Sequence, residues 1–165
     1  MRFTVGLGSL DVLDFHSFRY FPGMSKKSAK IAALIESCRG GALDAHYLGY
    51  FECFNLGLFY EAHDVLEELW LAERSGPNYG FFKGLIQFAG AFVHLQKNRL
   101  RPAAALLKLS RSYLEKYPAT HEQLDLAALR RLIEEWLEKL TAQNFATNPL
   151  QTNAAPKLKL ISAGQ

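Results

Sequence analysis

The stretch FYEAHDVLEELW, residues 59–70, places a histidine, four carboxylates and a tryptophan inside what reads as one helix. Successive residues of an α-helix turn by about 100°, so His63, Glu67 and Trp70 share one stripe. This spacing predicts a helix at 59–74 with one face in the core and a polar stripe at the edge of that core. The apolar face consists of Ala62, Leu66 and Leu69, and the far side carries Glu61, Asp64 and Glu68.

Helical spacing of apolar residues continues on both sides of this stretch and predicts an all-α protein. Glycine and proline mark the breaks, and Gly57 is expected to supply a left-handed cap. Ser25 is expected to cap the first helix, Pro102 to open the fifth, and Thr120–Gln123 to form a capping box before the sixth. The expected helices are 26–38, 43–56, 59–74, 78–97, 102–117 and 121–142.

The chain of 165 residues is long enough for one domain with a substantial core. We expect an irregular N-terminal arm at 1–24, with a short strand around Phe3–Leu7, and a helical domain at 25–142. Residues 143–165 read as a C-terminal tail, in which the alternation of Lys157–Leu160 indicates a short strand or a docking segment. The helical domain should be an antiparallel bundle of five or six helices.

The segment GLIQFAGAFVHL, residues 84–95, lacks charged residues and mixes small with large apolar side chains. Small residues allow a neighbouring helix to approach closely, so this helix is expected at the centre of the bundle. Gln87 and His94 are seven residues apart and share one stripe. If this helix and the preceding one form a hairpin, that stripe faces His63 and Glu67.

Three interpretations of these four residues remain open. They form a buried, hydrogen-bonded network, which we favour because polar groups in cores are more often satisfied than catalytic. Alternatively, His63, Glu67 and His94 bind a divalent metal, although neither HExxH nor ExxH spacing is present. In the third interpretation, Glu67 tunes His63 as a general acid or base. No other cofactor is predicted.

A weak internal echo appears at an offset of 41 residues. Gly57 aligns with Asn98, Ala62 with Ala103, and Leu66 with Leu107. Each copy reads as a helix, a left-handed turn, and a second helix with a small residue near its start, which resembles the hairpin of tetratricopeptide repeats.

The two copies differ in charge. Residues 59–75 hold five carboxylates against one arginine, and residues 96–117 hold six basic side chains against one glutamate. We favour two solvated faces that attract each other over a basic surface for a phosphate-bearing partner. Nucleic-acid binding is disfavoured, because no aromatic residue alternates with the basic positions before Tyr113.

Cysteine usage and the lengths of the apolar runs also bear on the cellular compartment. Cys38 and Cys53 form no CxxC pair, which fits a reducing, cytoplasmic compartment. The first residues do not read as a signal peptide, and no apolar run approaches the ~18 residues of a membrane span.

The segments FNLGLFYEAHDVLEELW and GLIQFAGAFVHL, followed by a basic turn with Ala103, resemble the domain of unknown function 309 family. The resemblance covers about 47–117 and implies a small helical bundle, mostly bacterial or plastid, without an established activity. Asn98-Arg99 and Pro102-Ala103 replace Gly-Asn and Gly-Ala of the family pattern. The matching signature positions are Glu61, His63, Glu67, Trp70, Gly84, Gln87 and His94.

The sequence therefore favours a structural or binding module for a protein or peptide over an enzyme. The alternative is an enzyme or metal-binding protein with its site at His63, Glu67, Gln87 and His94. Self-association through the arm and tail is a third possibility.

Overall fold

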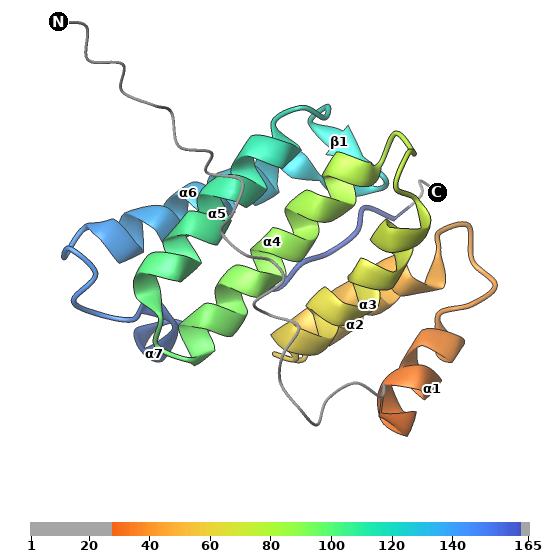
Figure 1. Ribbon diagram of the computed structural model, residues 1–165, viewed down its shortest axis with the longest axis horizontal. Helices are drawn as coiled ribbons and strands as arrows, with labels where there is room; N and C mark the ends of the chain where they lie inside the picture. Colours follow the sequence, from red (N-terminus) through yellow and green to blue (C-terminus); the bar gives the residue numbers. More distant parts are fainter. Residues whose placement is uncertain (1–27, 163–165) are drawn as a thin grey trace, which may run out of the picture.

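The computed structural model describes residues 28–162, and in these it contains seven helices and one two-stranded hairpin (Figure 1). The prediction of an all-α fold is confirmed. The helices are α1 (Ala29–Ser37), α2 (Ala45–Asn55), α3 (Phe59–Ala72), α4 (Tyr79–Gln96), α5 (Leu100–Leu114), α6 (Leu126–Thr141) and α7 (Pro149–Thr152), and the strands are β1 (Thr120–His121) and β2 (Leu124–Asp125).

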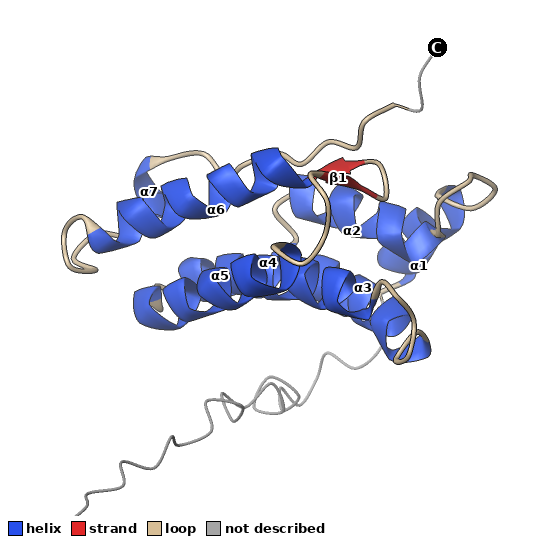
Figure 2. Ribbon diagram, turned by 90° about the horizontal axis from the view of Figure 1, so that it is seen from above, coloured by secondary structure: helices blue, strands red, loops and turns tan. Residues whose placement is uncertain are grey.

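The helices form two layers, with α3, α4 and α5 in one layer and α2 and α6 in the other (Figure 2). Between the layers lies an aromatic cluster. The Phe54 ring stacks on Phe88 at 5.2 Å between centroids, and Phe92 meets Trp136 edge-on at 4.8 Å. Aromatic pairs at these distances add to the stability gained from burying their area, so this cluster ties α2, α4 and α6 together.

Helix α4 lies between α3 and α5 in its layer, as its small residues predict (Figure 1). Every residue from Gly84 to Val93 is buried. A Cβ added at Gly84 would lie only 2.8 Å from the side chain of Leu114 in α5, and at Gly90 it would lie 3.2 Å from Leu106. Glycine at these positions therefore lets α5 pack directly against the α4 backbone.

The echo at 41 residues corresponds to two turns of the same geometry. Gly57 and Asn98 both have left-handed backbones, with φ of 76° and 55°. In each turn the next residue donates its N–H five residues back, from Leu58 to Cys53 and from Arg99 to His94, both at 2.9 Å. Asn98 adopts this conformation without glycine because asparagine tolerates it better than most residues.

Two predicted helix starts need correction. The first described helix is capped by Ser28, whose side chain accepts a hydrogen bond from the Ile31 N–H, while Ser25 lies outside the described residues. Helix α5 begins at Leu100, so Pro102 is its third residue. Proline fits there because the first N–H groups of a helix have no partner within it.

The predicted capping box at Thr120–Gln123 is wrong, because these residues belong to a β-hairpin. Thr120 pairs with Asp125 and His121 with Leu124, around a two-residue turn. Glu122 and Gln123 in that turn have φ of 47° and 58°, the left-handed values that the twist of a tight hairpin requires. Helix α6 instead starts after Asp125, whose carboxylate accepts the Ala128 N–H at 2.8 Å.

The C-terminal residues dock on the same chain. The Asn55 side chain exchanges two hydrogen bonds with the backbone of Leu158, and Lys157 donates to the Asn55 carbonyl. Leu160 forms a bridge with Leu124, beside the hairpin. The alternation of residues 157–160 thus indicates a docked, extended segment.

None of the helices within 28–162 has the length and apolar character needed to cross a membrane. The predicted arm at 1–24 and its strand at Phe3–Leu7 lie outside the described residues.

The α4–α5 contact generates a first prediction. Gly84→Ala should lower the free energy of unfolding by about 1–3 kcal/mol through overpacking against Leu114, despite the ~1 kcal/mol higher helix propensity of alanine. Gly41→Ala is the control, since a Cβ there meets nothing within 4 Å. Urea denaturation measures both, and a G84A protein as stable as wild type would contradict the close approach.

Candidate functional site

The seam between α3 and α4 carries the residues that the sequence singles out. His63 is 6% exposed and Gln87 3% exposed, while Glu61, Glu67, Trp70 and His94 are half-buried. His63 lies against α4 near Gly90, where an added Cβ would be 3.9 Å from its Cδ2 atom. Gln87 lies about one helical turn before Gly90, and His94 lies about one turn after it. His63 therefore faces α4 between Gln87 and His94.

Burial determines the protonation states of the two histidines in this seam. Desolvation lowers the pKa of His63 to about 4, so its imidazole is neutral at pH 7. The pKa of His94 is also lowered, first by desolvation and then by the charges of Arg99 and Lys97. Two neutral histidines are hydrogen-bonding groups rather than charges at this site.

Gln87 lacks the hydrogen bond expected of a buried amide. No described residue donates to its Oε1 atom, and the same holds for Ser110 Oγ in α5, which is fully buried. Gln87 lies one turn from Gly84, where an added Cβ would meet Tyr113 and Leu114, and Ser110 lies one turn from Leu114. Two buried oxygens without partners thus lie on the facing sides of α4 and α5.

Trp70 belongs to a different environment at the end of α3. Its ring is 5.2 Å from Tyr79, and the Lys83 ammonium lies 5.9 Å from Trp70 and 5.0 Å from Tyr113. These distances are typical of cation–π contacts, so Lys83 joins aromatic rings from α3, α4 and α5.

The seam does not gather a metal-ligand set from the described residues. Within 28–162, no three His, Cys, Asp or Glu side chains are placed to hold a metal ion. The placement of His63, Glu67 and His94 therefore gives no support to the metal interpretation.

A second candidate site, missed by sequence reasoning, is a pocket of about 210 Å³ where α2, the end of α3, the start of α4 and the hairpin turn meet. Its polar wall carries three carboxylates and an amide, and no lysine or arginine of residues 28–162 lines it. The apolar wall consists of Ala42, Leu43, Tyr47, Leu69 and Phe82, and the polar wall of Asp44, Glu73, Asn78 and Glu122. We call this site the carboxylate pocket.

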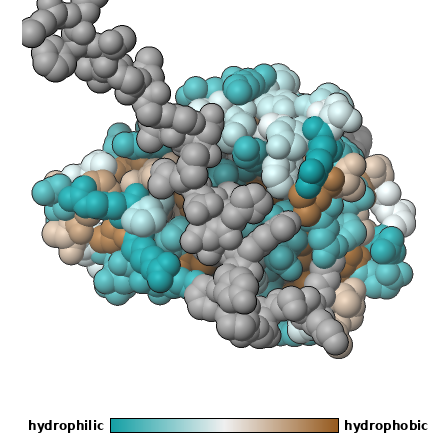
Figure 3. Space-filling view, viewed as in Figure 1, coloured by the Kyte–Doolittle hydropathy of each residue, from teal (hydrophilic) through white to brown (hydrophobic). Residues whose placement is uncertain are grey.

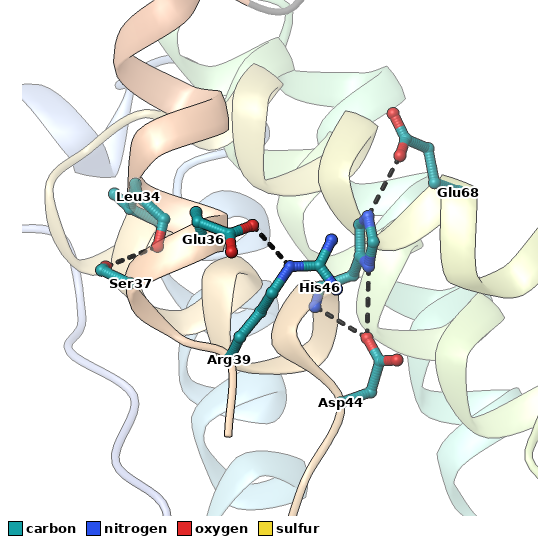
Figure 4. A network of polar contacts seen from close by, with 7 residues as sticks. All are labelled: Leu34, Glu36, Ser37, Arg39, Asp44, His46 and Glu68. Carbon is teal, nitrogen blue, oxygen red and sulfur yellow. Dashed lines mark hydrogen bonds and ion pairs between the residues drawn. The ribbon is translucent and has the colours of Figure 1, made fainter. Parts of the chain in front are cut away.

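Two of the three carboxylates are held in place. The Asn78 side chain donates to Glu122 Oε1 at 2.8 Å, and its Oδ1 atom forms a hydrogen bond with His121 Nε2 at 2.7 Å. Asp44 caps α2 by accepting the His46 N–H at 2.7 Å, and the His46 ring spans from Asp44 to Glu68 of α3 (Figure 4). These contacts hold the Asp44 and Glu122 side chains of the pocket wall in place without a ligand.

Glu73 is the carboxylate left available. It is exposed just beyond the end of α3, and its side chain forms no ion pair or hydrogen bond with residues 28–162. At the floor, the Tyr47 hydroxyl donates to the Glu122 carbonyl at 2.9 Å. Burial, and secondarily the charge of Glu122, raise the pKa of Tyr47, so the phenol stays neutral.

Comparison with known families agrees with the sequence motifs. Residues 47–106 match the family model described as Domain of unknown function (DUF309). The match covers 60 of the 165 residues. No curated protein and no solved structure matches the chain. The DUF309 segment runs from Tyr47 in α2 to Leu106 in α5, so it includes the whole seam, whereas Asp44 and Glu122 of the carboxylate pocket lie outside it.

The shifted pKa of His63 predicts a pH-dependent stability. Its folded pKa of about 4 lies below the ordinary 6.5, so the unfolded state binds the proton first as pH falls. Stability from this group is complete above about pH 7 and is lost between roughly pH 6.5 and 4, by about 3 kcal/mol. His63→Gln should remove this component, which urea titrations across the range will measure. An unchanged slope in H63Q would contradict a buried neutral imidazole.

The unpartnered Gln87 oxygen predicts a stabilising substitution. Gln87→Met keeps the shape of the side chain and removes the buried acceptor, so the free energy of unfolding should rise by about 1 kcal/mol. Thermal and urea unfolding of Q87M measure this. A loss of 1 kcal/mol or more would show that the amide makes a stabilising hydrogen bond.

Proposed function

We propose that this protein is a non-enzymatic helical module that binds a protein or peptide through a basic side chain at the carboxylate pocket. The observation that supports it is an apolar floor beneath three carboxylates, of which Glu73 forms no side-chain ion pair or hydrogen bond with the described residues. Lysine and arginine have an apolar stem and a charged head, and this arrangement matches both parts. The free thiols of Cys38 and Cys53 are consistent with a reducing, cytoplasmic setting.

The size of the pocket favours a side chain over a free metabolite. Sites for small molecules usually measure ~300–1,000 Å³, and this pocket measures about 210 Å³. The stem of an arginine would lie against Tyr47, Leu69 and Phe82, and its planar head suits paired carboxylate oxygens.

The outer surface also favours recognition by charge. Within residues 28–162, the exposed large hydrophobic side chains are Leu56 and Ile161. The face in Figure 3 is mainly hydrophilic where grey atoms do not cover it. A partner helix that inserts several apolar anchors would need a wider apolar groove.

The seam supports a second candidate function, a small-ligand or catalytic site at His63, Glu67, Gln87 and His94. The specific observation in its favour is the unpartnered Gln87 Oε1, because a buried acceptor without a donor destabilises the fold. His63 on the facing stripe is neutral at pH 7, and a neutral imidazole offers a ligand one hydrogen-bond donor and one acceptor. In this function, Gln87→Met would stabilise the protein and abolish a ligand effect together.

Binding at the carboxylate pocket is tested with N-acetyl-arginine amide, followed by the NMR signals of the Asn78 side-chain amide. A dissociation constant on the order of 1 mM is expected for one side chain. The double variant Glu73→Gln, Glu122→Gln should weaken it about tenfold, because two charge-assisted contacts are lost.

Two controls accompany this titration. N-acetyl-citrulline amide has the same shape without the charge and should not bind, and Glu135→Gln, an exposed residue of α6, should bind like wild type. Equal binding of citrulline and arginine, or an unaffected double variant, would contradict the proposed function.

A further inference from the structure

The turn between α4 and α5 presents a second charged surface. Lys97, Arg99 and Arg101 are all exposed there, and we call residues 97–101 the basic turn. Neither Arg99 nor Arg101 forms an ion pair with the part of the chain that the structure describes. Elsewhere on α5, by contrast, Arg111 is paired with Glu134 at 2.6 Å. Arg99 and Arg101 therefore carry charge that is available to a partner.

The basic turn is rigid. Asn98 holds its left-handed conformation while the Arg99 N–H donates to the His94 carbonyl at 2.9 Å. From the C-terminal region, the buried Asn148 side chain donates to the Leu95 carbonyl at 2.7 Å and to Asn98 Oδ1 at 3.2 Å. The Arg101 guanidinium lies 4.5 Å from the Phe145 ring. A fixed turn loses little conformational entropy on binding.

The basic turn and the carboxylate pocket lie at opposite ends of α4 (Figure 1). The pocket uses Asn78 and Phe82 at the start of this helix, and the basic turn begins at Lys97, immediately after its end. The helix has 18 residues, which corresponds to a length of ~27 Å at 1.5 Å per residue. A rigid helix of this length keeps the turn away from the pocket of its own chain.

We infer that the basic side chain recognised by the carboxylate pocket belongs to a second copy of this chain, so that molecules associate head to tail with Arg99 in the neighbouring pocket. This inference rests on the proposed function and names its partner. The two surfaces complement each other in charge. The contact is heterologous, so it produces rings or open chains rather than a two-fold dimer.

Exposed charge pairs contribute little individually, so this association is weak and sensitive to salt. At about 1 M salt the Debye length falls to roughly 3 Å, and the attraction between the surfaces is screened. Sedimentation velocity of the full chain should therefore show oligomers that grow with protein concentration at low salt and disappear at high salt.

Two sets of variants locate the contact. Glu73→Gln with Glu122→Gln removes the charge of the pocket, and Arg99→Gln with Arg101→Gln removes that of the basic turn. Each double variant alone should be monomeric at low salt. Their equimolar mixture should form a dimer and nothing larger, because each variant keeps one complementary surface. The matched control Glu135→Gln with Lys108→Gln, both exposed and outside these two surfaces, should assemble like wild type.

Several outcomes would overturn the inference. These are a wild-type chain that is monomeric at low salt, a dimer that persists in both double variants, and a mixture that fails to form the dimer. Circular dichroism checks that each variant is folded. If N-acetyl-arginine amide still binds the pocket while wild type stays monomeric, the inference fails and the proposed function stands, with the basic partner being another protein.

Discussion

The whole structure depends on the close approach of α5 to the backbone of α4 at Gly84. Because α4 has α3 and α5 beside it and the aromatic cluster beneath it, almost every side chain along it is buried. Polar residues on α4 are therefore confined to the seam, at Gln87 and His94, and to the ends of the helix. The carboxylate pocket and the basic turn are both built at those ends, so the helix that stabilises the fold also sets the distance between them.

Local patterns predicted the elements that depend on local chemistry. The lack of charge and the small residues in 84–95 indicated a central helix, and Gly57 indicated a left-handed turn. The hairpin at 120–125 was missed because Thr120–Gln123 has the residue types of a capping box. Its turn uses Glu122 and Gln123 in left-handed conformations, without the glycine or asparagine that would mark it. Contact with Asn78 and Tyr47, distant in sequence, supports that turn instead.

Of the two candidate sites, the seam was predictable from the sequence and the carboxylate pocket was not. The spacing of His63, Gln87 and His94 placed them on facing stripes, because helical periodicity and a short connection fix a hairpin. The carboxylate pocket has no such signal, since its walls come from separate segments between Ala42 and Glu122. The acidic charge of 59–75 was apparent in the sequence, but which of its carboxylates joins a pocket depends on where α3 ends.

The most direct test of the role of α4 is native-state hydrogen exchange. If the burial of α4 governs the fold, its amides from Phe82 to Gln96 will exchange only through global unfolding, with opening free energies equal to the free energy of unfolding from urea. The amides of the peripheral α1 will exchange through local opening, with opening free energies below the free energy of unfolding. Amides of α4 that exchange at lower free energy than those of α6 would contradict the account.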